Sequence, residues 1–158
     1  MKPSKVQFNR IKSILEVQFP NLKVKQILVN IDIVLSRKTN RIKEVNEISE
    51  NKKLLLFALR PNDGHLIPSL YGAQKILDTG YEGNRVIMSN DSCPFIQQGK
   101  SAFCKHVVEV DHNVIPNSEV FILNPNRELI AIGTALQPGY AMLQMQSGIA
   151  VKTKKYKK

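Results

Sequence analysis

Four residues in the second half of the chain have side chains that could bind a metal ion. Cys93, Cys104, His106 and His112 offer thiols and imidazoles, which are the usual ligands of zinc. A structural zinc site usually contains a pair of closely spaced cysteines, and this sequence has none. Each cysteine also falls where a small apolar residue would serve. We therefore expect two reduced thiols, no metal site and no cofactor.

Groups that could catalyse a reaction are equally sparse. His65 follows Asp63 closely enough to suggest an acid-base pair, but both belong to the turn that begins at Pro61-Asn62-Asp63-Gly64. The sequence contains no nucleophile elbow, no phosphate-binding loop, no dinucleotide fingerprint and no H-E-x-x-H motif. No carboxylate pair is tied to a nucleophile. These observations predict a protein that is not an enzyme.

Positive charge is the strongest chemical feature of the chain. The net charge is +10 and the isoelectric point is about 9.7, as expected of a protein whose partner carries phosphates. Residues 1–84 carry a net charge of +6, and five of the nine cations in residues 85–158 lie in the last seven residues, KTKKYKK. This tail has two interpretations: a phosphate-binding segment, or a solvated and frayed end.

Length and composition favour a folded protein. The chain has 158 residues, of which 42% are apolar, so it can form one ordinary domain or two small ones. No apolar run approaches the roughly 20 residues of a membrane-spanning helix. The first residues, MKPSKVQF, lack the apolar core of a signal peptide. We expect a cytoplasmic protein with no membrane partner.

The first half, residues 1–84, is predicted to be a small α/β domain. Apolar residues between Phe8 and Phe19 recur at helical spacing until Pro20 stops the pattern. Alternation within 24–35 predicts a half-buried strand, and the run LLLFAL at 54–59 predicts a buried one. Ser69 to Leu77 is predicted to be a helix. The segment DTGYEGN at 78–84 contains two glycines and marks the domain boundary.

The second half, residues 85–158, is predicted to be a mostly β domain. Two apolar runs, 119–123 and 129–136, flank a turn built on proline and asparagine and so predict a hairpin. Gly133 within the second run predicts a bulge or a close approach of another backbone. A short helix is expected within 138–146, followed by a last strand at 149–151.

Local signals are densest between Arg85 and Val108. A short strand at 85–88 leads into a polar turn, and Asp91 or Ser92 is placed to cap a helical turn that contains Pro94. Gly99 is placed to end that helix in a left-handed conformation. Residues 101–104 return to an extended pattern, which places Lys100 and the pair Lys105-His106 at the two ends of a strand.

The order of these parts resembles a PUA domain, a compact pseudo-barrel that binds RNA in many RNA-modifying and translation proteins. The best matching segments are I-A-I-G-T-A at 130–135 and G-I-A-V at 148–151. Gly99, Phe103 and Val107 also match the family pattern. Asp91-Ser92 replaces the usual Gly-Ala, and Lys105-His106 replaces the usual Pro-Gly. The resemblance implies an α+β chain: a small N-terminal α/β domain followed by a mostly β PUA pseudo-barrel.

The first half is similar to the domain that precedes PUA in the malignant T-cell amplified sequence family and its archaeal relatives. The similar segments are ILEVQFP at 14–20, LLLF at 54–57 and IPSL at 67–70. This resemblance implies an RNA-binding protein of the translation apparatus that contacts tRNA, or rRNA of the small ribosomal subunit, in initiation, reinitiation or recycling. It also implies a protein partner in translation.

The resemblance also implies which residues bind RNA, because the helix-to-strand turn and the last strand line the RNA groove in related PUA domains. The predicted RNA-binding residues are Gly99, Lys100, Lys105, His106, Lys152, Lys154 and Lys155. Two other functions stay open. The +6 half could dock an acidic protein, with the PUA half as scaffold, or the chain could be an RNA-binding accessory subunit of an RNA-modifying enzyme.

Overall fold

A computed structural model describes all 158 residues, and the chain divides into two compact units. Unit 1 is Met1–Tyr81 and unit 2 is Glu82–Lys158. The division falls a few residues before the boundary at Asn84 that the sequence predicts. None of the helices combines the length and the hydropathy needed to cross a membrane.

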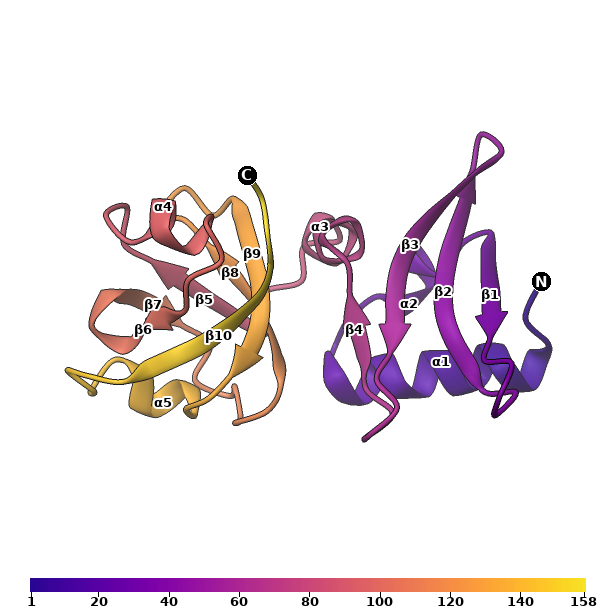
Figure 1. Ribbon diagram of the computed structural model, residues 1–158, viewed down its shortest axis with the longest axis horizontal. Coiled ribbons are helices and arrows are strands. Elements are labelled where there is room, and N and C mark those ends of the chain that lie inside the picture. Colours follow the sequence, from indigo (N-terminus) through magenta and orange to yellow (C-terminus); the bar gives the residue numbers. More distant parts are fainter. The chain divides into compact units, whose positions relative to one another are not determined.

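Unit 1 is a four-stranded antiparallel sheet in the order β1-β2-β3-β4, with helix α1 running across one face (Figure 1). Its core is formed by apolar side chains from α1, from the strands and from α3, including Ile11, Leu15, Phe57 and Ile76. The elements are α1 (Lys5–Gln18), α2 (Val24–Ile27), β1 (Ile31–Leu35), β2 (Ile42–Ser49), β3 (Lys52–Leu59), β4 (Leu66–Pro68) and α3 (Leu70–Asp78).

Helix α1 forms where the apolar periodicity predicts it. Ser4 caps its start, because the Ser4 hydroxyl accepts a hydrogen bond from the Gln7 N–H while the Gln7 side chain accepts one from the Ser4 N–H. Ile11 and Leu15, four residues apart, share the face that is buried in the core. The helix ends at Gln18, just before Pro20.

The strand predicted within 24–35 is too long at its start. Val24 and Ile27 are buried from one turn of helix α2, where residues three apart share a face. Asn30 then takes a left-handed conformation, with φ of 51°, and β1 begins only at Ile31. The predicted alternation of Val29, Ile31, Ile33 and Leu35 is therefore a strand from Ile31 onward, and Val29 is exposed before it.

One residue on each edge strand of this sheet has partners for its backbone groups. The Gln18 side-chain amide donates to the Leu66 carbonyl oxygen at 2.9 Å, and its oxygen accepts from the Leu66 N–H at 2.7 Å. At the other edge, the Met1 amino group donates to the Ile33 carbonyl oxygen, and the Ile33 N–H donates to the Met1 carbonyl oxygen. Satisfied edges limit pairing with other strands.

Unit 2 is a six-stranded, nearly closed pseudo-barrel with strand order β6-β10-β9-β8-β5-β7. Only the pairing of β5 with β8 is parallel. The predicted α+β class is confirmed, with the small α/β unit preceding the β pseudo-barrel. The elements are β5 (Arg85–Met88), α4 (Cys93–Ile96), β6 (Ala102–Phe103), a 3-10 turn η1 (Cys104–His106), β7 (Val107–Val110), β8 (Glu119–Leu123), β9 (Leu129–Ala135), α5 (Gly139–Met142) and β10 (Ile149–Tyr156).

The predicted hairpin is β8 and β9, whose residues are all buried. Gly133 pairs with Thr153 of β10, and a Cβ at this position would collide with the carbonyl oxygen of Lys152. The close backbone approach expected at Gly133 is thus confirmed. The last strand runs to Tyr156, well beyond the predicted 149–151, so most of the basic tail is a paired strand rather than a frayed end.

The edge contact at Gln18 generates a stability prediction. Replacing Gln18 with Ala leaves the N–H and carbonyl groups of Leu66 without these partners in a partly buried place, so the free energy of unfolding should fall by about 1–3 kcal/mol. Urea denaturation measures this change. The control is Gln26→Ala, an exposed position on α2, which should stay within about 0.5 kcal/mol. Equal losses in the two variants would contradict the role assigned to Gln18.

Candidate nucleic-acid interface

The site begins with the turn that follows β5. Ser92 occupies the N-cap position of α4, and Pro94 lies in the first turn, as expected. Contrary to the predicted capping role, the Ser92 hydroxyl donates to the Ser89 carbonyl oxygen at 2.9 Å and makes no cap hydrogen bond. Asp91 is exposed. The hydroxyl of Ser92 therefore stabilises the turn from Ser89 to Ser92 rather than the start of α4.

Gly99 closes this helix in the left-handed conformation predicted for it, with φ of 94°. The Gly99 N–H donates to the Ile96 carbonyl oxygen at 2.9 Å. A Cβ on Gly99 would lie 3.0 Å from a ring carbon of Tyr156, a residue of β10. A side chain is therefore disfavoured here both by the backbone conformation and by the neighbouring ring.

Strand β10 lies along this turn and fixes its position. Val151 and Ile149 pair with Ala102 and Phe103 of β6. Further along β10, the Thr153 hydroxyl donates to the Lys100 carbonyl oxygen at 2.9 Å. The structure thus brings together the two predicted RNA-binding segments, which are far apart in the sequence.

The pair Lys105-His106 was predicted at the end of a strand, and this prediction is wrong. The pair lies in the 3-10 turn η1 between β6 and β7. The turn is anchored because the Ser89 N–H donates to the His106 carbonyl oxygen at 2.9 Å. Cys104, the first residue of the turn, is buried, whereas Lys105 is exposed. The anchored backbone therefore presents the lysine to solvent from a defined position.

A pocket of about 310 Å³ lies between these segments. Three of the predicted residues line it, namely Lys100, Lys105 and His106. The rest of the lining is Asp91, Ser92, Phe95, Ser101 and Phe103. Gly99 and the predicted lysines of β10 are not part of the lining, so the predicted residues lie in the pocket, in the turn at Gly99 and on the strand β10.

The β10 lysines differ in their surroundings. Lys152 pairs with Thr134 of β9 and is exposed. The register skips Lys154, which is the extra residue of a β-bulge and is also exposed, while Lys155 is half-buried. None of these three, nor Lys100 or Lys105, forms an ion pair with a carboxylate. All five are available to pair with phosphate oxygens without breaking an internal ion pair.

Two aromatic side chains complete the site. Phe95 is 56% exposed and Phe103 is 43% exposed, although both are large and apolar. Exposed rings beside cations are typical of sites that bind unpaired nucleotides, because a ring stacks on any base while the cations contact the backbone. Sequence reasoning missed Phe95, because its neighbours Ile96 and Cys93 are buried and no periodic pattern distinguishes it.

The residues considered as zinc ligands are not gathered at one site. Cys93 and Cys104 are buried in the apolar core of unit 2, and burial raises the pKa of both thiols. No group of three or more His, Cys, Asp or Glu side chains is arranged to hold a metal ion. In unit 1, Asp63 accepts hydrogen bonds from Arg60, which lower the pKa of Asp63 to about 2. Asp63 therefore stabilises the turn between Arg60 and His65.

Comparison with known families agrees with this arrangement. Residues 84–157 match the PUA domain, and residues 9–80 match the patch-forming domain C2 of tRNA-guanine transglycosylase. The two matches follow the order of the two units, with the C2 match in unit 1 and the PUA match in unit 2. The pocket and strand β10 lie within the residues that match the PUA domain. The predicted resemblance of the first half to the malignant T-cell amplified sequence family is not shown by these matches.

Curated relatives extend over almost the whole chain. A tRNA-guanine(15) transglycosylase of Methanosphaera stadtmanae is 40% identical over 156 residues, which is 96% of this chain and 23% of the relative. A protein of the same name from Thermococcus onnurineus is 33% identical over 156 residues, 98% of this chain and 26% of the relative. The chain thus spans about a quarter of the length of these relatives.

Solved structures share the fold. A hypothetical protein from Pyrococcus horikoshii has a TM-score of 0.74 at 20% identity, covering 98% of this chain and 92% of that one. A conserved PUA domain protein from Thermoplasma acidophilum has a TM-score of 0.61 at 18% identity, covering 98% and 91%. At these identities the likeness shows the fold alone.

The expectation that the protein is not an enzyme is wrong. The relatives that match nearly the whole chain are named as transglycosylases, which are enzymes. The absence of familiar catalytic motifs did not exclude membership of an enzyme, because a chain can match a segment of an enzyme that contains none of those motifs.

Gly99 and Gly148 form a matched pair for a test of the turn. Both have φ near +95°, so replacing either with Ala introduces similar backbone strain of about 1 kcal/mol. The Cβ of Gly148→Ala meets only an ordinary contact with Met145, whereas that of Gly99→Ala also presses on Tyr156. We expect the larger loss of unfolding free energy in Gly99→Ala, measured by urea denaturation. Equal losses would show that Tyr156 does not restrict this turn.

Proposed function

We propose that this chain is the tRNA-binding part of a tRNA-guanine transglycosylase, with the PUA pocket and strand β10 forming the RNA-binding surface. The observation that carries the proposal is the 40% identity to such an enzyme over 96% of the chain, spanning both units in order. Base exchange then requires the rest of such an enzyme, on the same or another polypeptide. The accessory role in RNA modification is thus preferred over a role in translation.

The geometry of the site supports RNA as the ligand. Lys100 and Lys105 at the pocket and Lys152 and Lys154 on β10 are exposed cations without internal partners. Such cations bind phosphates with an affinity that depends on salt but little on sequence. Selectivity then comes from RNA shape and from unpaired bases that can reach the exposed rings beside the pocket.

The predicted contact of Lys105 and His106 with RNA is part of this proposal. Where related domains have Pro-Gly, this chain presents an ammonium group and an imidazole to the pocket. We infer that side-chain cations contact the RNA here. A cytoplasmic location, where tRNA is modified, is part of the same proposal.

Neutralising the surface tests the proposal. In the variant Lys100→Gln/Lys105→Gln/Lys152→Gln, affinity for folded tRNA should fall about tenfold or more, because each lost phosphate contact weakens binding. The slope of log affinity against log salt should become shallower by up to about 3. Fluorescence anisotropy at several salt concentrations measures both quantities.

The matched control removes the same charge elsewhere, in the variant Lys23→Gln/Lys25→Gln/Lys52→Gln. These three lysines are exposed residues of unit 1 without ion pairs. If both variants lose the same affinity, binding reflects net charge and the surface is not the site. Absence of salt-dependent tRNA binding by the unaltered protein would refute the proposed function itself.

A further inference from the structure

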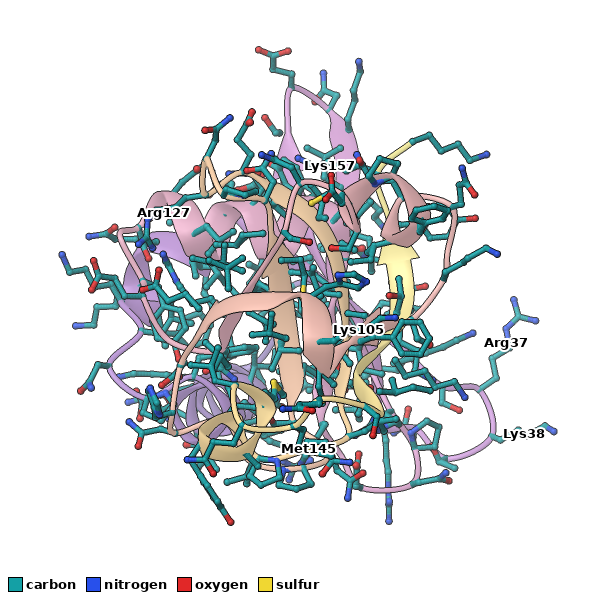
Figure 2. The ribbon with its side chains drawn as sticks, turned by 90° about the vertical axis from the view of Figure 1, so that its left-hand side faces the viewer. Arg37, Lys38, Lys105, Arg127, Met145 and Lys157 are labelled. Carbon is teal, nitrogen blue, oxygen red and sulfur yellow. The ribbon has the colours of Figure 1, made fainter.

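A second group of cations lies in unit 1, at the tip of the hairpin formed by β1 and β2. The segment from Ser36 to Lys43 reads SRKTNRIK and contains four cations and no carboxylate. Its cations are Arg37, Lys38, Arg41 and Lys43, and all four are exposed. Figure 2 shows the side chains of Arg37 and Lys38 extending away from the ribbon. We call these four residues the hairpin cations.

The tip has a defined backbone. The Ser36 N–H donates to the Arg41 carbonyl oxygen at 2.8 Å, and the Asn40 N–H donates to the Ser36 carbonyl oxygen at 2.8 Å. Asn40 takes the left-handed conformation, with φ of 59°, that closes the turn. A cationic side chain on such a turn is presented from a fixed point, so less backbone entropy is lost when it binds.

The register places Lys43 in a special position. Val34 pairs with Glu44 and Leu35 pairs with Ile42, so Lys43 is the extra residue of a β-bulge. Bulges commonly redirect a side chain and interrupt strand pairing. Ile42 beside it is buried in the core and anchors this end of β2. Lys43 thus lies on a packed strand, and the other three hairpin cations lie in the hydrogen-bonded turn that precedes it.

The ion pairs of unit 1 leave these cations uncompensated. Asp32 is paired with the Met1 amino group at 2.7 Å and with Lys53 at 3.0 Å, and hydrogen bonds from both groups lower the pKa of Asp32. Glu47 binds Lys75 and the Tyr71 hydroxyl. Burial opposes ionisation of Glu47, but those two partners hold its pKa below the usual value. These carboxylates are committed to cations other than the hairpin cations.

None of the hairpin cations forms an ion pair. Glu44, the carboxylate next to Lys43 in the sequence, is half-buried and forms none either. Four unpaired cations within seven residues, Arg37 to Lys43, repel one another, and a polyanion relieves that repulsion. Two of the four are arginines, whose planar guanidinium groups match the geometry of phosphate oxygens.

We propose that the hairpin cations form a second RNA-binding surface, which contacts the phosphate backbone of the same tRNA that the PUA domain binds. The proposal rests on the proposed function for the identity of the RNA. Two surfaces on one chain raise each other's effective concentration, so a weak contact at the hairpin adds substantially to the affinity of the whole chain.

The full-length variant Arg37→Gln/Lys38→Gln/Arg41→Gln tests this surface. Affinity for folded tRNA should fall about tenfold, and the salt slope should become shallower by up to about 3, because up to three phosphate contacts are lost. The control is again Lys23→Gln/Lys25→Gln/Lys52→Gln, which removes the same charge from unit 1. Lys25 precedes β1 and Lys52 follows β2, so these residues lie toward the opposite end of the two strands from the tip.

The outcomes separate the two proposals. If the hairpin variant binds tRNA as tightly as the control while the PUA variant is weakened, the hairpin proposal is wrong and the proposed function stands. If the unaltered chain does not bind tRNA, both are wrong. As a second measurement, ultraviolet crosslinking of the unaltered complex followed by mass spectrometry should recover peptides from residues 36–43 joined to RNA. Recovery of crosslinks from unit 2 alone would also overturn the hairpin proposal.

Discussion

The pairing of β10 with two other strands is the constraint on which unit 2 and its site depend. On one side β10 pairs with β9, where Gly133 permits close backbone contact, and on the other it pairs with β6. Its Thr153 and Tyr156 hold the turn at Lys100 and Gly99. The strand that completes the sheet therefore also supplies cations to the surface and positions the pocket residues beside it.

Some cations of the chain form ion pairs with carboxylates, and others form none. In unit 1, Asp32, Glu47 and Asp63 bind cations within their own unit, so those charges contribute to the fold. The hairpin cations have no such partners, and neither do the lysines of the proposed PUA surface, namely Lys100, Lys105, Lys152 and Lys154. Exposed ion pairs contribute little to stability, whereas groups of unpaired cations dominate the interaction with a polyanion. The net charge of +10 therefore describes the proposed function less well than the two places where unpaired cations are grouped.

Much of the fold could be predicted because its signals are local. The period of α1, the apolar run of β3 and the hairpin of β8 and β9 each follow from neighbouring residues. The length of β10 could not be predicted, because lysines have no preference for strands and only pairing with β9 orders them. Likewise, the exposure of Phe95 and Phe103 depends on the pocket around them. The basic hairpin was counted only as part of the charge of the first half, since only the folded structure shows that Asp32 and Glu47 pair with other cations.

The central claim is that this chain serves tRNA-guanine transglycosylation through its PUA surface. The most direct measurement is mass spectrometry of the nucleoside at position 15 of tRNA from cells whose chromosomal copy encodes Lys100→Gln/Lys105→Gln/Lys152→Gln. The account predicts that unexchanged guanine accumulates at that position, while cells with the Lys23→Gln/Lys25→Gln/Lys52→Gln control keep the normal nucleoside. Normal exchange in the first variant, at a normal protein level and with tRNA binding lost in vitro, would contradict it.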